Sequence, residues 1–210
     1  MAQDSAEALI EATVAMHSAG KPLMRLVLPA DDEPEQWAHY PPDDAISPVS
    51  RSRYFYHCHP PEERGEGEHG HFHLFLPLAL FAEEDCQSAP PEDGENRARV
   101  VHFTALSVDM QGVPLQLFTT NRWVTDEWLC SADAIAAVID RFDLEGADGD
   151  PHVNQWLTAF VALAREPIID LLHRRDAVLE AKGWPGEDRA VEIASSTPAD
   201  LQALLDQALA

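Results

Sequence analysis

The chain has 210 residues, 37 of them acidic and 14 of them Lys or Arg, so its formal net charge at pH 7 is −23. Its hydrophobic fraction of 45% is ordinary for a globular protein, and its length is enough for one sizeable core. The negative charge argues against nucleic acid or an anionic membrane surface as a partner.

The first predicted element is a helix that Asp4 or Ser5 caps and Gly20 ends. Its expected inner stripe consists of Leu9, Ile10, Val14 and His17. Residues 21–28 form a short apolar segment that suits an edge strand. Acidic residues and the lack of a basic stretch argue against a secretory signal at this end of the chain. No apolar run approaches the length that spans a bilayer.

Residues 29–48 are acidic and rich in proline, which indicates an ordered surface loop anchored by Trp37 and Tyr40. A second acidic loop, residues 83–96, is the expected place for disorder. The three cysteines are odd in number and widely spaced, so they do not indicate a disulfide framework. We therefore expect a cytoplasmic protein.

Between these loops lies a segment with five of the ten histidines: His57, His59, His69, His71 and His73. The runs 54–59 and 69–76 suit two strands, and the Pro-, Gly- and charge-rich residues 60–68 suit the loop between them. All five histidines stand at odd positions. A pairing of His57 with His71, and of His59 with His69, therefore puts them on one face of the sheet.

Neutral imidazole is a common protein ligand of zinc and also suits iron, and three histidines leave a coordination position open for water or substrate. The five histidines therefore predict a mononuclear site for a divalent transition metal, Fe(II) or Zn(II). The alternative is a solvated, histidine-rich strand face. Glu63 and Glu68 are nearby carboxylates and Arg64 is a candidate anion-binding group, so these three are the candidate catalytic residues. His102 could reach the same face, whereas Cys58 points to the core.

The later part of the chain predicts one more hairpin and then helices. Residues 99–109 and 113–120 are β-rich runs joined by a turn. Ser131 can cap a helix and Asp150 can start another, which Pro167 must kink or divide. The inner residues of the final helices are Ile135, Val138, Ile139, Phe142, Trp156, Leu157, Phe160, Val161, Leu201, Leu204 and Leu205. Thr197-Pro198 opens the last of them.

Strands grouped in the middle, with helices before and after, indicate an α+β fold. We expect a central antiparallel sheet of four to six strands, open or barrel-like, within a single domain of residues 1–210. The histidine-rich sheet would occupy about 50–125 and the helical part about 130–210. The face with Tyr54, Tyr56, Phe72, Leu74 and Leu76 should pack against the helices, which leaves the histidine face to meet a small-molecule substrate.

Two motifs within the histidine segment resemble known families. His57-Cys58-His59, followed by Glu63 and Gly70, is similar to the first metal motif of the cupins, which implies a metal-dependent dioxygenase, isomerase or lyase on a β-barrel. The run from His69 to Phe75 is similar to the histidine-triad motif. That resemblance implies a nucleotide hydrolase that needs no metal and in which His71 is the nucleophile.

The segment as a whole also resembles an uncharacterised bacterial family of unknown function with an HxHP…EHGHFH signature, carried here by residues 57–60 and 68–73. This family brings no activity with it. From the histidines themselves we expect a metalloenzyme of oxygenase, lyase or hydrolase type that acts on a small molecule. One alternative is a protein that binds a metal or haem without catalysis. The other is a nucleotide hydrolase of the histidine-triad kind.

Overall fold

A six-stranded antiparallel sheet forms the centre of the computed structural model, which describes residues 2–29, 34–89, 99–184 and 188–210. The strands follow the order β1-β2-β3-β5-β6-β8, so β1 and β8 are the two edges and the sheet is open rather than barrel-like. This arrangement confirms the predicted α+β class. The strands are β1 (Tyr40–Ile46), β2 (Arg53–His57), β3 (Gly70–Pro77), β5 (Val100–Val108), β6 (Pro114–Thr120) and β8 (Ile193–Pro198).

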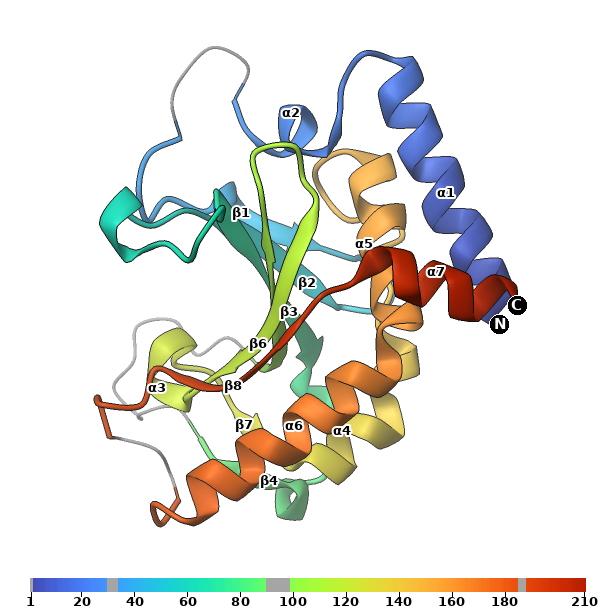
Figure 1. Cartoon of the computed structure of the whole chain (residues 1–210). Helices are drawn as coiled ribbons and strands as arrows, with labels where there is room; N and C mark the ends of the chain where they lie inside the picture. The colour runs from blue at the N-terminus through green and yellow to red at the C-terminus, as the bar shows by residue number, and fades with distance from the viewer. Residues whose placement is uncertain (1, 30–33, 90–98, 185–187) are drawn as a thin grey trace.

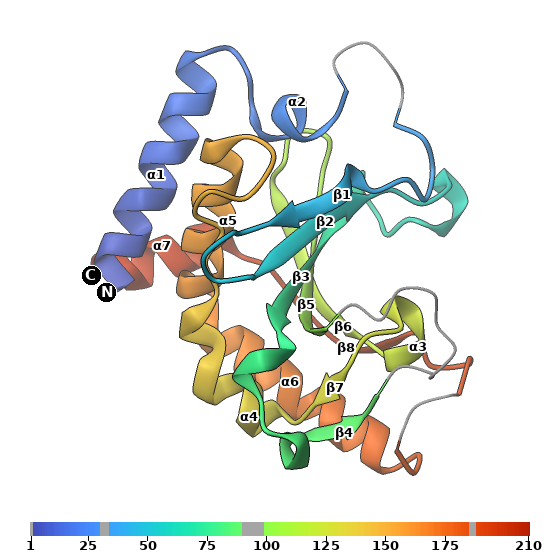
Figure 2. The ribbon, with the colours of Figure 1, turned by 180° about the vertical axis from the view of Figure 1, so that it is seen from behind.

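Most of the helices lie together on one side of this sheet (Figures 1 and 2). They are α1 (Ala2–Ser18), α2 (Leu23–Val27), α4 (Ala132–Val138), α5 (Pro151–Leu163), α6 (Arg165–Glu180) and α7 (Leu201–Leu209). The short helix α3 (Arg122–Thr125) and the turn η1 (Pro61–Glu63) lie beyond the other side. The helical layer therefore covers one face of the sheet, and loops surround the opposite face. In the described part of the chain no helix is long and apolar enough to cross a membrane.

The covered face of the sheet is the predicted one. Tyr54, Tyr56, Phe72, Leu74 and Leu76 are buried and belong to one apolar cluster with residues of α1, α4, α5 and α6. Burying one such side chain stabilises the fold by about 1.5–3 kcal/mol. Strict alternation along β2 and β3 then directs the odd-numbered residues to the other face.

The inner face of α1 differs from the predicted stripe. Leu9 is buried, but Ile10 and Val14 are 39% and 57% exposed. The buried residues of this helix are Ala6, Leu9, Ala12 and Met16. The two alanines let α1 approach α5 closely, so packing follows small residues that a search for large apolar side chains passes over.

Three local predictions are wrong. Residues 23–27 form the helix α2 rather than an edge strand, and residues 40–46 of the first predicted loop form β1. Residues 193–198 form the polar edge strand β8, so Thr197-Pro198 ends a strand rather than opening the last helix, which begins at Leu201 after its cap Asp200. The two prolines of β1, Pro41 and Pro42, lie within the register shift between Tyr40 and Ala45, where the regular pairing with β2 is interrupted.

The second predicted loop is also partly ordered. It contains the turn η3 (Glu83–Asp85) and the short strand β4 (Cys86–Ser88), while residues 90–96 of this prediction lie outside the described residues. β4 pairs with β7 (Leu129–Cys130), and a disulfide joins Cys86 to Cys130, contrary to the expectation from cysteine number. As predicted, the helical run before Pro167 is divided, with α5 ending and α6 beginning at Ala164.

Gly70 is the position where β3 leaves the loop and meets the end of β2. A Cβ at residue 70 would overlap the carbonyl oxygen of His57 and the phenol of Tyr56, neither of which can move freely. Gly70→Ala should therefore lower the free energy of unfolding by about 3 kcal/mol, measured by urea denaturation. In the control Gly65→Ala, the new Cβ meets only the flexible end of Glu68, so a similar loss in both variants would contradict this explanation.

Candidate metal centre

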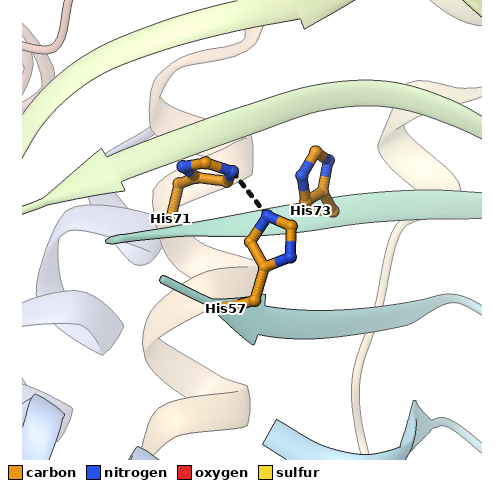
Figure 3. A group of neighbouring side chains, drawn as sticks. All are labelled: His57, His71 and His73. Atoms are coloured by element: carbon orange, nitrogen blue, oxygen red, sulfur yellow. Dashed lines mark hydrogen bonds between the residues drawn. The ribbon is translucent and has the colours of Figure 1, made fainter. Parts of the chain in front are cut away.

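Three imidazoles meet on the sheet face that the helices leave uncovered. β2 and β3 pair so that His57 stands opposite His71, as predicted, and His73 follows two residues later on the same side of β3. Each of the three offers a ring nitrogen, and these nitrogens all lie within 4.8 Å of one another. Figure 3 shows the rings of His57 and His71 pointing toward each other across the two strands, with His73 beside them. The Nε2 atoms of His57 and His71 are 2.8 Å apart.

A carboxylate fixes the orientation of the His71 ring. Oε1 of Glu68 lies 2.7 Å from Nδ1 of His71, and because a carboxylate only accepts, Nδ1 carries the proton. The lone pair of His71 is then on Nε2, toward His57. Burial by itself raises the pKa of Glu68, but hydrogen bonds from His71 and from the backbone of Gly65 outweigh it, so the net pKa is lowered.

A second chain of hydrogen bonds supports His73. Its Nδ1 lies 3.0 Å from Nε2 of His102 on β5, and Nδ1 of His102 lies 3.3 Å from the hydroxyl of Thr120 on β6. Histidines that bind metals commonly use their second ring nitrogen in this way, with a neighbour that sets the tautomer. His71 and His73 thus both have such a neighbour, and the predicted reach of His102 to this face is confirmed.

The structure places the other two candidate histidines differently. His59 adjoins the group, with its Nε2 3.3 Å from Nε2 of His57 and its ring against that of Trp37. The ladder ends at His57, so the predicted pair of His59 and His69 does not form. His69 instead lies 2.6 Å from the hydroxyl of Tyr56, through its Nδ1, and is not among the lining residues of the cavity over the cluster.

The three candidate catalytic residues all line this cavity. Glu68 holds His71, as described above. Oε2 of Glu63 lies 3.7 Å from Nδ1 of His59. Arg64 donates from Nε to the carbonyl oxygen of His59 at 2.6 Å, so it ties the loop to the end of β2. Their catalytic roles stay predictions.

The cavity has a volume of about 1480 Å³ and extends along the uncovered sheet face. Its walls come from the strands β1, β2, β3 and β6, the loop after His57, the helix α3 and the segment before β8. Aromatic rings of Trp37, Phe55, Phe118 and Trp123 alternate in it with charged groups. A small molecule entering this space can thus reach the imidazoles.

The Nε2 atoms of His57 and His71 fit a metal ion after a small adjustment. With metal–nitrogen bonds of about 2.0–2.1 Å, two nitrogens on a tetrahedral ion are about 3.3 Å apart, and two at a right angle about 3.0 Å. The 2.8 Å between His57 and His71 must therefore open by about half an ångström or less. At present the proton between these nitrogens belongs to His57, because Nε2 of His71 has the lone pair. For His57 to bind an ion through Nε2, that proton would move to Nδ1, which gives the other neutral tautomer.

The surroundings of His57, His73 and His102 keep these three histidines neutral. Burial, and then the neighbouring imidazoles, lower the pKa of His57 to about 2 and that of His73 well below its usual value of 6.5. Burial, and then the charge of Arg175, lower the pKa of His102 to about 3. Neutral imidazole is the form that binds a metal.

Other lining residues carry functional groups that the sequence did not single out. They are His39, Asp44, Arg53 and Glu127, which lie between 4 and 70 positions from His57 in the sequence. Only Arg53 had a signal in the sequence, because it shares the odd register of His57 on β2. The others come from an edge strand and a loop, which periodicity does not place.

Comparison with known proteins identifies one family. The family described as "Domain of unknown function (DUF6969)" matches residues 3–199, nearly the whole chain. No curated protein and no solved structure matches the chain.

The neutral histidines predict a loss of stability in acid. In metal-free protein, His57, His73 and His102 stay unprotonated at pH 5, while in the unfolded chain they take up protons near pH 6.5. The unfolded state therefore binds more protons, and the free energy of unfolding should fall between pH 7 and pH 5 by on the order of 1 kcal/mol per pH unit for each histidine. Urea denaturation across this pH range measures the slope.

The variant His73→Leu/His102→Leu should have a clearly smaller slope, and removal of the exposed His152 should leave it unchanged. Equal slopes for the wild type and the double variant would show that these two histidines are protonated in the folded state.

Proposed function

The chain belongs to this family of unknown function, and we propose that it is a metalloenzyme in which His57, His71 and His73 bind one divalent transition-metal ion. The observation that carries the proposal is the convergence of three imidazoles at the wall of a large cavity. Zn(II) and Fe(II) both suit ligation by imidazole. A bound ion would polarise a small substrate or activate water or dioxygen.

The hydrogen bonds around the cluster support a built site rather than a chance grouping. A solvated strand face has no need of Glu68 on His71 or of His102 on His73, yet both contacts are present at 2.7 and 3.0 Å. His73 is 2% exposed and His71 is 6% exposed. Burying three adjacent imidazoles at the expense of their hydration is reasonable where an ion takes the place of water.

One side of the cluster faces the cavity, and this favours catalysis over simple metal storage. The group of converging ligands in the described residues has three members, and a carrier site is usually closed by a fourth protein ligand. The remaining position would face the cavity and accept water or substrate. His59, next to His57, could move a proton to or from a molecule bound there.

The geometry weighs against the histidine-triad alternative. That chemistry requires the three alternate histidines of β3 to act on one substrate, but His69 is hydrogen-bonded to Tyr56 and does not line the cavity. Its place beside His71 is taken by His57 from the neighbouring strand.

Elemental analysis of purified protein tests the metal site directly. We expect about one Zn or Fe per chain, and almost none in a His57→Ala/His71→Ala variant, because the one remaining imidazole cannot hold a divalent ion. His152→Ala removes an exposed histidine of α5 and is the matched control, which should keep its metal. Metal that persists in the double variant, or a parent with far less than one ion per chain after loading, would refute the site.

Glu68→Ala tests the supporting carboxylate separately. Without it, the His71 ring loses the partner that sets its tautomer, so metal affinity should fall about 10- to 100-fold, measured by competition with a chromophoric chelator. Glu66→Ala removes an exposed acid from the same loop and controls for the change in charge. Equal losses in both variants would mean that Glu68 acts only through its charge.

A further inference from the structure

The cavity has a second polar end, formed by Arg53 and Glu127. Among the described residues, Nε of Arg53 and Oε2 of Glu127 are buried and have no hydrogen-bond partner. A buried polar atom without a partner costs about 1–3 kcal/mol, so native proteins rarely keep one without a reason. Two such atoms of complementary type in the wall of one cavity point to a ligand that supplies their partners.

Neighbouring groups leave both side chains available. Arg53 forms an ion pair with Asp44, whose Oδ2 lies 3.6 Å from Nη1; this is too long for a hydrogen bond and leaves Nε without a partner. The other oxygen of Asp44 lies 3.2 Å from Nδ1 of His39. Among the described residues, no ion pair with its charged atoms within 4.0 Å joins Arg53 to Glu127. Each of the two therefore has capacity for an outside partner.

We propose that Arg53 and Glu127 bind the carboxylate group of a small organic acid, which rests on the proposed function in that this acid would be the substrate of the metal centre. The guanidinium of Arg53 matches a carboxylate in shape and charge. Glu127 in its protonated form donates its O–H to the same carboxylate. Nε of Arg53 and Oε2 of Glu127 have almost no accessible surface, so each side chain would turn toward the ligand to make the hydrogen bond that it lacks.

The surroundings of Glu127 keep it protonated at neutral pH. Burial raises its pKa to about 8; Asp44 on β1 and Asp126 after α3 act in the same direction, and Arg53 on β2 opposes them. Below pH 8 the carboxyl group is a donor. Above pH 8 it is an anion and repels a carboxylate, so binding should weaken as the pH rises through this value.

The strand sets the length of the ligand. Arg53, Phe55 and His57 alternate along one face of β2, and successive strand residues are about 3.3 Å apart, so Arg53 and His57 are roughly 13 Å apart along the strand. Phe55 lies between them with its ring stacked on that of His39 at 3.7 Å. The middle of the ligand would rest on this apolar surface. An acid with an aromatic or aliphatic body fits, with its carboxylate at one end and its reacting group at the imidazoles.

Fluorine NMR on chelator-treated, metal-free protein tests the subsite without the metal. The probes are 4-fluorobenzoate, neutral 4-fluorobenzamide and the 4-fluorobenzylammonium cation. We expect 4-fluorobenzoate to bind at pH 7 about tenfold or more tightly than the other two, and to weaken above pH 8. Equal binding of the amide, or preference for the cation, would overturn the proposal on wild-type protein alone.

Three variants identify the groups responsible. Arg53→Gln should weaken 4-fluorobenzoate binding about tenfold or more. Glu127→Gln should retain binding at pH 7, because the amide still donates, and should lose the decline above pH 8. Glu192→Gln, an exposed acid of the same cavity, should keep both the affinity and the pH profile. Unchanged binding in Arg53→Gln would overturn the proposal.

Metal content measured on the same preparations separates the two proposals. Arg53→Gln and Glu127→Gln should hold as much metal as the parent, since neither residue belongs to the ligand group. If the parent binds 4-fluorobenzoate through Arg53 but takes up no metal, the subsite stands and the metalloenzyme does not. If it takes up metal but shows no preference for the carboxylate, the subsite is wrong and the metal centre stands.

Discussion

The site depends on the antiparallel register of two strands. β2 and β3 pair with Tyr56 opposite Phe72 and His57 opposite His71. A shift of one residue would turn every side chain to the other face, placing imidazoles in the apolar core and tyrosines in the cavity. Because Tyr54, Tyr56, Phe72 and Leu74 are buried against the helices, the hydrophobic effect that holds the helical layer also fixes the histidines in position. The same strand register thus determines both the core and the site.

Burial then determines the chemistry of that face. Trp37, Phe55 and Phe118 line the cavity around the imidazoles, and burial disfavours the charged forms of His57 and His73. Glu68 and Thr120 end the two chains of hydrogen bonds through His71 and through His73 with His102. These hydrogen bonds orient His71 and His73 before any ligand arrives, which reduces the cost of reorganisation for these two rings.

Local sequence patterns were enough to predict the parts of the structure that depend on alternation. The odd spacing of His57, His71 and His73 predicted their common face, and the even positions predicted the core. Patterns failed where a contact distant in sequence decides the structure. Ser195 lies in a polar segment, and it becomes part of a strand because its hydroxyl meets Thr119 and the carbonyl oxygen of Leu171.

The same limit applies to the site. His69 has the right register, but the pairing of β2 with β3 ends before it, and its ring is hydrogen-bonded to the phenol of Tyr56. Glu127 lies in a loop more than fifty residues after Arg53 in the sequence, and only the fold brings the two residues near each other. An alternating pattern indicates which face a side chain is on; it contains no information on where strand pairing stops or which loop closes over the sheet.

The net charge of the protein affects ligand binding at both ends of the cavity. A net charge of −23 attracts a divalent cation and repels an organic anion. Exposed acids at the cavity, Glu62, Glu63 and Glu192, act in the same direction. An acid substrate would therefore enter more easily after the ion has bound, since two positive charges at the imidazoles offset part of this field. At the far end Arg53 carries a positive charge next to Asp44, and a protonated Glu127 adds no negative charge, so a carboxylate meets less repulsion there than it would beside an ionised Glu127.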